Sequence, residues 1–148
     1  MTFDQKIRSD LIADEGIVYA VYLDHLGQKT CGIGHMCRPG EPEYSMPVGS
    51  VVKPPRVSDL FANDLLQAEA DCRALFDQWD DLQEDVRRIT LNMAFNLGRS
   101  RLAKFVQFRA AVNRGDWSAA ADEMEDSRWA KQLPRRSARL ISRMRSIV

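Results

Sequence analysis

Two carboxylates and a threonine lie close together in the stretch EGIVYAVYLDHLGQKTCGIGH, residues 15–35. Glu15 is followed by Gly16, and glycine readily adopts the left-handed conformation that ends many helices, so we expect Glu15 at a helix terminus. Asp24 begins the tetrapeptide DHLG between two runs of apolar or β-branched residues, which predicts a hairpin turn. A helix end followed by a hairpin can hold two carboxyl groups on either side of a cleft.

Paired carboxyl groups are suited to the cleavage of glycosidic bonds. One protonated carboxyl donates its proton to the leaving oxygen, and one ionised carboxylate activates water or stabilises the developing cation. Desolvation near a helix end is expected to raise the pKa of Glu15, whereas Asp24 on an exposed turn is expected to stay ionised. The alternative is that both are ordinary surface acids, since the chain carries 21 acidic residues and such pairs mark sites only statistically.

The wider pattern resembles the signature of the phage-type lysozymes, the muramidases of the T-even bacteriophages and their relatives. That signature is a glutamate, an aspartate after eight intervening residues, a threonine after five more, and a Gly-x-Gly-His motif, which is residues 32–35 in this chain. The resemblance implies that Glu15 is the general acid, that Asp24 is its partner carboxylate and that Thr30 holds the attacking water.

The resemblance continues toward the C-terminus. The segment NMAFNLG at residues 92–98 looks like the family's helix on the far wall of the cleft, and SRW at 127–129 with QLP at 132–134 looks like its SRW…P segment. It implies sugar contacts from Asn96, Arg128 and Gln132. For Asn96 the alternative is a helix-end residue that is hydrogen-bonded only to solvent.

The resemblance also implies three supporting residues. His35 is expected to be structural, paired with Asp64 near the start of a long helix. Arg136 is expected to lie beside Glu15, where it would hold the carboxyl and pull its pKa down, against the effect of desolvation. The alternative is that a neighbouring arginine of the same terminal helix takes this place and Arg136 is solvated.

Local patterns place the elements that would position these residues. Thr2 and Gln5 form a capping-box pattern that opens a helix ending at Gly16, and residues 17–34 form the hairpin. Residues 36–57 carry five of the six prolines, which predicts a loop of about twenty residues without a regular helix. Ser58 is the predicted N-cap of a long helix. The rest is predicted helical, with breaks at the glycines 98 and 115, a cap at residue 116 and a terminal helix opened by the proline at 134.

We therefore predict an α+β fold of the lysozyme type in one domain, residues 1–148. A small β-hairpin lobe takes up about 16–57 and an interlobe helix 58–78, while residues 1–15 and 79–148 build a larger all-helical lobe. The resemblance implies an active site between the lobes.

Composition is that of an ordinary soluble globular chain, with 45% hydrophobic and 28% charged residues over 148 positions. No apolar run approaches the roughly 20 residues of a membrane span, and the N-terminus lacks the apolar region of a signal peptide. Residues 1–86 hold 7 basic against 16 acidic side chains, and residues 87–148 hold 14 against 5. This asymmetry favours lobes that attract each other, or a basic face for an anionic polymer.

Three cysteines, at positions 31, 37 and 72, cannot all pair within the chain, and without a signal peptide they predict free thiols in a reducing compartment. Cys31, His35 and Cys37 have a C-x3-H-x-C spacing that is not a standard zinc arrangement and would need Cys72 as a fourth ligand. Buried structural thiols are the favoured interpretation, and no metal is predicted.

The resemblance implies a phage endolysin that hydrolyses the β-1,4 bond between N-acetylmuramic acid and N-acetylglucosamine in peptidoglycan, with inversion and without a cofactor. It implies a monomer, made in the bacterial cytoplasm, that neither binds nucleic acid nor inserts into membrane and is released to the wall by a holin-type protein.

Two other classes of function stay open. One is a lytic transglycosylase, which has no need of Asp24 or Thr30. The other is a non-catalytic wall-binding or nucleic-acid-binding protein, suggested by the basic C-terminal half.

Overall fold

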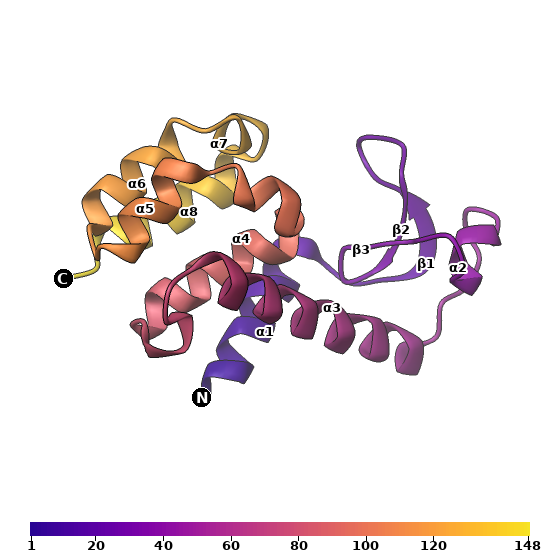
Figure 1. The fold of residues 1–148 in the computed structure, drawn as a ribbon. Helices are drawn as coiled ribbons and strands as arrows, with labels where there is room; N and C mark the ends of the chain where they lie inside the picture. The colour runs from indigo at the N-terminus through magenta and orange to yellow at the C-terminus, as the bar shows by residue number, and fades with distance from the viewer. The chain divides into compact units, whose positions relative to one another are not determined.

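The computed structural model describes all residues from 1 to 148. The chain divides into two compact units, Met1–Gln67 and Ala68–Val148, called here the N-terminal and the C-terminal unit. The N-terminal unit contains α1 (Phe3–Glu15), β1 (Val18–Leu23), β2 (Lys29–Gly32), β3 (His35–Met36) and α2 (Pro42–Ser45), and α3 (Pro54–Leu75) begins in it. Helices combined with one small antiparallel sheet confirm the predicted α+β class (Figure 1).

Helix α1 begins and ends where its sequence predicts. The Thr2 side chain accepts a hydrogen bond from the Gln5 backbone, and the Gln5 side chain accepts one in return from the Thr2 backbone. Ile7 and Leu11 are fully buried on one face. Gly16 ends the helix at φ 73°, with its N–H donating to the Ile12 carbonyl at 2.8 Å. Glu15 is therefore the last helical residue.

The sheet has the order β1-β2-β3, and both strand pairs are antiparallel. In the first pair Tyr22 lies opposite Thr30, and an irregularity separates this register from the Val18–Gly32 pairing. The connecting turn is closed by hydrogen bonds from the Asp24 N–H to the Gln28 carbonyl and from the Gly27 N–H to the Asp24 carbonyl, each 2.9 Å. The predicted hairpin is confirmed, with Asp24 as the first residue of its turn.

The proline-rich segment corrects the sequence-based prediction. Residues 36–57 were expected to form an irregular loop, but they contain helix α2 and a β-bridge between Val51 and Ala20. Helix α3 begins at Pro54 rather than at Ser58, and it ends at Leu75 rather than near residue 78. The physical reason is that prolines break helix interiors but fit the first helical turn, where the backbone N–H groups have no partner within the helix.

Ion pairs and hydrogen bonds anchor this segment to the rest of the N-terminal unit. The Glu43 carboxylate, 3% exposed, accepts hydrogen bonds from the Arg56 guanidinium on α3, the shortest 2.7 Å. The Lys29 ammonium on β2 donates to the Tyr44 and Met46 carbonyls at the end of α2, at 3.0 and 2.6 Å. The segment therefore holds the hairpin from one side.

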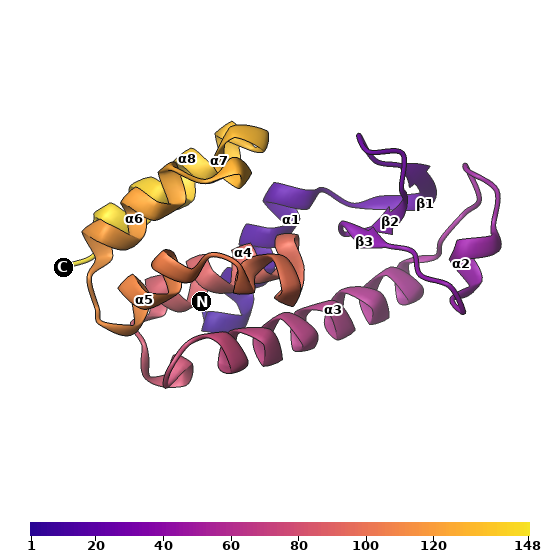
Figure 2. The same cartoon turned by 45° about the horizontal axis from the view of Figure 1, so that its top comes forward.

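The C-terminal unit is helical. It contains the end of α3, the 3-10 turn η1 (Trp79–Asp81), α4 (Glu84–Ala103), α5 (Val106–Asn113), α6 (Trp117–Glu125), α7 (Arg128–Gln132) and α8 (Pro134–Arg145). Gly98 interrupts α4 at φ 78°, Gly115 has φ 73°, and the Asp116 side chain caps α6, as predicted. Figures 1 and 2 show α6 running beside α8 and α5 within this unit. No helix combines the length and the apolar character that crossing a membrane requires.

Candidate active site

The Glu15 carboxyl group lies directly against the backbone of Gly34. A Cβ atom at Gly34 would stand 2.8 Å from Glu15 Cδ and closer still to Glu15 Oε2, so any side chain there would force the carboxyl group out of its present position. Gly34 also has φ +61°, in the left-handed region that side chains disfavour. The second glycine of the Gly-x-Gly-His motif therefore provides the space that the Glu15 carboxyl group occupies, which is called here the seat of Glu15.

Asp24 is positioned by its own turn. Its Oδ1 atom accepts backbone hydrogen bonds from Leu26 at 2.9 Å and from Gln28 at 2.8 Å. These two bonds fix the carboxyl group relative to the hairpin, and they leave Oδ2 for another partner. A short aspartate side chain that bonds to the backbone of its own turn is the arrangement that favours Asp at this place.

Thr30 is buried, with 5% of its surface exposed. Its hydroxyl donates to the Gln28 carbonyl at 3.0 Å. Because that bond uses the only hydroxyl proton, the Thr30 oxygen can act only as an acceptor toward a water molecule. The hairpin thus presents a carboxylate oxygen and a hydroxyl oxygen that can each accept a hydrogen bond.

Tyr22 is a site residue to which the sequence analysis assigned no role. It lies opposite Thr30 in the strand register and two residues before Asp24, so these three side chains belong to one face of the hairpin. Burial raises the pKa of the Tyr22 phenol, and the negative charges of Glu15 and Asp24 raise it further. Both carboxylates therefore act on this phenol, and the two-residue spacing of Tyr22 and Asp24 is the signal that could have identified it.

His35 is bound on both ring nitrogens, and the predicted pair with Asp64 is present. Nδ1 lies 2.7 Å from Asp64 Oδ2, and Nε2 lies 2.9 Å from Glu41 Oε1. Burial by itself would lower the pKa of His35, but the hydrogen bonds and charges of the two acids outweigh it, so this pKa is raised. Neither ring nitrogen is left for a metal, and the neighbouring cysteines are free, buried thiols.

Glu41 is the second residue that sequence reasoning missed. Its side chain also accepts the Arg38 backbone N–H at 2.7 Å. Burial tends to raise the pKa of Glu41, but the bonds from His35 and from the Arg38 backbone outweigh it and lower this pKa. Glu41 lies in the proline-rich segment, where no motif marked it.

In the C-terminal unit, Asn96 holds a tryptophan in place. Its Oδ1 atom accepts a hydrogen bond from Trp129 Nε1 at 3.0 Å, and Trp129 is only 3% exposed. Asn96 is therefore not a helix-end residue bonded to solvent alone, and its amide NH₂ group remains a donor for a ligand.

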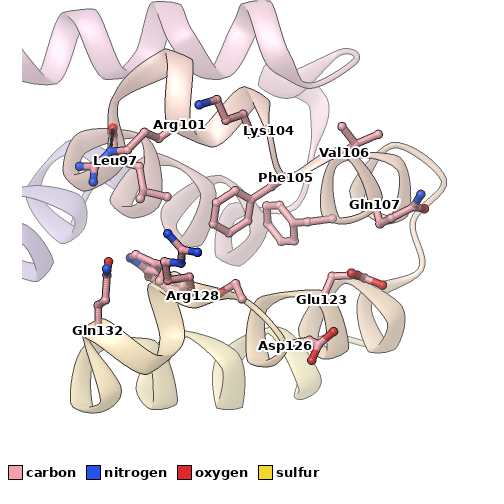
Figure 3. A pocket seen from close by; sticks show the side chains of 13 residues that line it. Leu97, Arg101, Lys104, Phe105, Val106, Gln107, Glu123, Asp126, Arg128 and Gln132 are labelled. Carbon is pink, nitrogen blue, oxygen red and sulfur yellow. Dashed lines mark hydrogen bonds between the residues drawn. The ribbon is translucent and has the colours of Figure 1, made fainter.

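Arg128 and Gln132 line a pocket of about 510 Å³ in the C-terminal unit (Figure 3). Its apolar floor includes Phe105 and Phe108, whose rings meet edge to face at 6.3 Å. The charged residues around it are of both signs: Arg101, Lys104, Glu123, Asp126 and Arg128. A pocket of this kind accepts a ligand with apolar surface and charged groups.

Arg136 is buried, with 8% of its surface exposed, and its Nε donates to Asn92 Oδ1 at 2.9 Å. It is thus not the solvated arginine of the alternative interpretation. The expected contact with Glu15 joins residues of the two units, and it stays a prediction.

The family model of phage lysozymes matches residues 13–146. This chain belongs to the phage lysozyme family. A probable T4-type lysozyme 2 of Dictyostelium discoideum is 27% identical over 93% of this chain and 92% of its own length. A second such protein of that organism, probable T4-type lysozyme 1, has the same identity and coverage. The pre-baseplate central spike protein Gp5 of Enterobacteria phage T4 is 26% identical over 86% of this chain, which corresponds to 25% of that protein.

Membership in the phage lysozyme family supports a peptidoglycan hydrolase of the muramidase type. The predicted signature residues Glu15, Asp24 and Thr30 all fall in the first part of the matched range. They belong to the N-terminal unit, together with Gly34, Tyr22 and His35.

The two-sided binding of His35 predicts a specific pH dependence of stability. Because its folded pKa is raised, the contribution of charged His35 is complete below the unfolded value of about 6.5 and is lost as pH rises through the folded pKa. Because the folded pKa of Glu41 is lowered, its contribution is present above about 4.3 and is lost as pH falls through its folded pKa. The contribution of the pair is therefore greatest at mildly acidic pH.

We expect His35→Asn to lower the free energy of unfolding by about 2 kcal/mol near pH 5.5, since charged hydrogen bonds of a buried group are lost. Urea unfolding from pH 4 to 9 measures this difference, which should shrink as pH rises. The matched control is His25→Asn, at the exposed histidine of the hairpin turn. A difference that is constant with pH would contradict a charged His35.

Proposed function

We propose that this phage lysozyme family member hydrolyses the β-1,4 bond between N-acetylmuramic acid and N-acetylglucosamine in bacterial peptidoglycan. The observation that carries the proposal is the arrangement of the N-terminal unit. A carboxyl group seated on Gly34, a carboxylate held by its turn and an accepting hydroxyl all lie around the Tyr22 face of one hairpin. These are the groups that acid-assisted attack by water requires.

In the proposed reaction Glu15 donates its proton to the glycosidic oxygen, and the electrons of the breaking bond go to that oxygen. A water molecule attacks the anomeric carbon from the opposite side. Asp24 takes one proton of this water through Oδ2, while the Thr30 oxygen accepts a hydrogen bond from the other O–H. Two acceptors orient the water so that its lone pair faces the sugar, and direct attack by water inverts the anomeric centre.

The orientation of Thr30 supports this role. If the Thr30 hydroxyl were free to rotate, it could donate a hydrogen bond to the water as readily as accept one. That bond would occupy one of the two lone pairs of the water oxygen. The bond to the Gln28 carbonyl removes that possibility. Gln28 also donates its N–H to Asp24 Oδ1. The backbone of this one turn residue therefore orients both the Asp24 carboxylate and the Thr30 hydroxyl.

The proposed substrate contacts of the C-terminal unit are Asn96, Arg128 and Gln132. Arg128 and Gln132 line the pocket of Figure 3, and Asn96 offers an amide group beside Trp129. Peptidoglycan combines sugars with peptides that carry charged groups, and the pocket offers cations, acids and an aromatic floor for such a ligand. We further propose that Arg136 lies beside Glu15 in the active enzyme and holds its carboxyl group.

The proposed setting is that of an endolysin: a monomer made in the bacterial cytoplasm and released to the wall by a holin-type protein. The similarity to the spike protein Gp5 favours a second setting, in which such a domain is part of a phage particle. A lytic transglycosylase and a non-catalytic wall-binding protein remain the alternatives for the activity itself. Mass spectrometry of products from purified peptidoglycan decides among them, since a transglycosylase leaves an anhydro-muramic end that is one water lighter, and a binder leaves no product.

Glu15→Gln tests the general acid. The amide keeps the shape and hydrogen bonding of the side chain but has no acidic proton, so we expect kcat to fall by at least ~10²-fold. Release of reducing ends from peptidoglycan measures it. The control is Glu69→Gln, on α3, whose ion pair with Arg73 is long at 3.7 Å. A Glu15→Gln enzyme that retains a tenth of wild-type turnover would rule out Glu15 as the acid.

Gly34→Ala tests the seat of Glu15. The new methyl group would displace the carboxyl group, and a displacement of about 1 Å costs on the order of a hundredfold in rate. Gly115→Ala is the matched control, because Gly115 has a similar φ of +73° while a Cβ there meets only an ordinary contact at 3.9 Å. Both variants should lose about 1 kcal/mol of stability from backbone strain, but only Gly34→Ala should lose activity when both are folded. Equal activity in the two variants would show that the contact is unimportant.

Tyr22→Phe tests the phenol that the charges of Glu15 and Asp24 reach. The substitution removes a polar group from the candidate site, so we expect kcat for the release of reducing ends from peptidoglycan to fall about tenfold. Tyr19→Phe is the control, since Tyr19 is 48% exposed on the same strand. Equal kcat values for Tyr22→Phe and wild type would exclude this role.

A further inference from the structure

Two of the three thiols lie next to each other in the sheet that contains the candidate active site. Cys31 lies in β2 and Cys37 directly follows β3, and their Sγ atoms are 3.9 Å apart. The two residues are 0% and 6% exposed. Neither thiol takes part in the proposed hydrolysis.

The sheet register places this pair. Cys31 lies opposite His35, and the Cys37 N–H donates to the Lys29 carbonyl at 2.9 Å, which continues the same ladder. Cys37 is two residues beyond His35, so both thiols belong to one face of the sheet as diagonal neighbours across two strands. Their closeness therefore follows from backbone pairing and is not a chance approach of mobile side chains.

We propose that Cys31 and Cys37 form a disulfide when the chain folds in an oxidising environment. The sulfur atoms must approach from 3.9 Å to about 2.05 Å, which side-chain rotation with a small strand shift can supply. The two thiols give up two protons and two electrons. The acceptor is another disulfide, of a small molecule such as oxidised glutathione or of an oxidising protein, and it is reduced to two thiols.

The reaction proceeds by thiol–disulfide exchange. One thiolate attacks the acceptor disulfide, expels the first leaving thiolate and forms a mixed disulfide, and the second cysteine then attacks this intermediate and expels the second. The thiolate is the reacting form. Burial raises the pKa of Cys31 to about 12 and also raises the pKa of Cys37. Because both thiols are buried and their thiolates are disfavoured, we expect the bond to form faster during folding than in the folded chain.

The consequence is a cross-link around the turn that carries Gly34 and His35. Closing this loop reduces the freedom of the unfolded chain and stabilises the fold. The same chain would keep free thiols when it folds in a reducing cytoplasm and carry a covalently closed turn when it folds in an oxidising compartment. The inference does not depend on the proposed hydrolysis.

The experiment refolds the denatured, reduced wild-type chain in a glutathione buffer as oxidising as a secretory compartment, with a reducing buffer in parallel. After denaturing alkylation, trypsin cleaves after Lys and Arg except before Pro, so residues 30–56 stay in one peptide with Cys31 and Cys37, and residues 57–73 carry Cys72. We expect neither cysteine of the first peptide to be alkylated. This peptide should weigh two hydrogens less than the same peptide with two free thiols. Cys72 should be alkylated and serves as the internal control.

A second arm exposes the folded dithiol protein to the same oxidising buffer. We expect oxidation at least tenfold slower than during refolding, and equal rates would overturn the proposal that burial blocks the folded thiols. A third arm compares melting temperatures of the two refolded forms, and the oxidised form should melt several degrees higher. Cys37→Ser should abolish this redox dependence, whereas Cys72→Ser should keep it.

Alkylation of both thiols of peptide 30–56 after oxidative refolding would refute the proposed Cys31–Cys37 disulfide. A disulfide from either cysteine to Cys72 or to glutathione would refute it as well. The mass measurement needs only the wild-type chain, so the result stands if a serine variant fails to fold.

Discussion

The close approach of the Glu15 carboxyl group to Gly34 is the contact on which the N-terminal unit depends. It joins the end of α1 to the turn between β2 and β3, and a side chain at Gly34 would displace the carboxyl group. The residue that follows Gly34 is His35, which two carboxylates hold from α3 and from the proline-rich segment. One turn therefore carries both the seat of the proposed acid and the anchor of the surrounding segments.

Much of this unit could be predicted because its determinants are local in sequence. The capping box at Thr2, the glycine after Glu15 and the hairpin turn at Asp24 each act over four or five residues, and the structure confirms all three. The proposed catalytic residues fall in the same window of 21 residues as the Gly-x-Gly-His motif. The His35–Asp64 pair spans 29 residues, and only the family resemblance pointed to it. In the C-terminal unit the helix breaks at Gly98 and Gly115 followed from the conformational freedom of glycine.

What could not be predicted depends on position within an element or on contacts between distant segments. Proline content was used as evidence against helix, yet Pro42 and Pro54 each open one, because proline is excluded from a helix interior and not from its first turn. Glu41 and Glu43 have no local pattern. One accepts a hydrogen bond from His35 and the other from Arg56, and only the folded chain brings these partners together. The pocket around Arg128 gathers residues 97–132, and its shape is likewise absent from any single stretch.

The division of roles between the units has a physical consequence. The residues proposed for proton transfer are held by short backbone contacts within residues 15–35, where a displaced atom changes the reaction itself. Five of the thirteen residues that line the pocket of the C-terminal unit are exposed charged side chains, and exposed charges tolerate replacement at small cost in stability. If the pocket binds substrate as proposed, residues such as Arg101, Lys104 and Glu123 can vary while Glu15, Asp24 and Thr30 stay unchanged. In the proposed division of roles the chemistry depends on the turn at Gly34, whereas recognition depends on the charge and shape of the pocket.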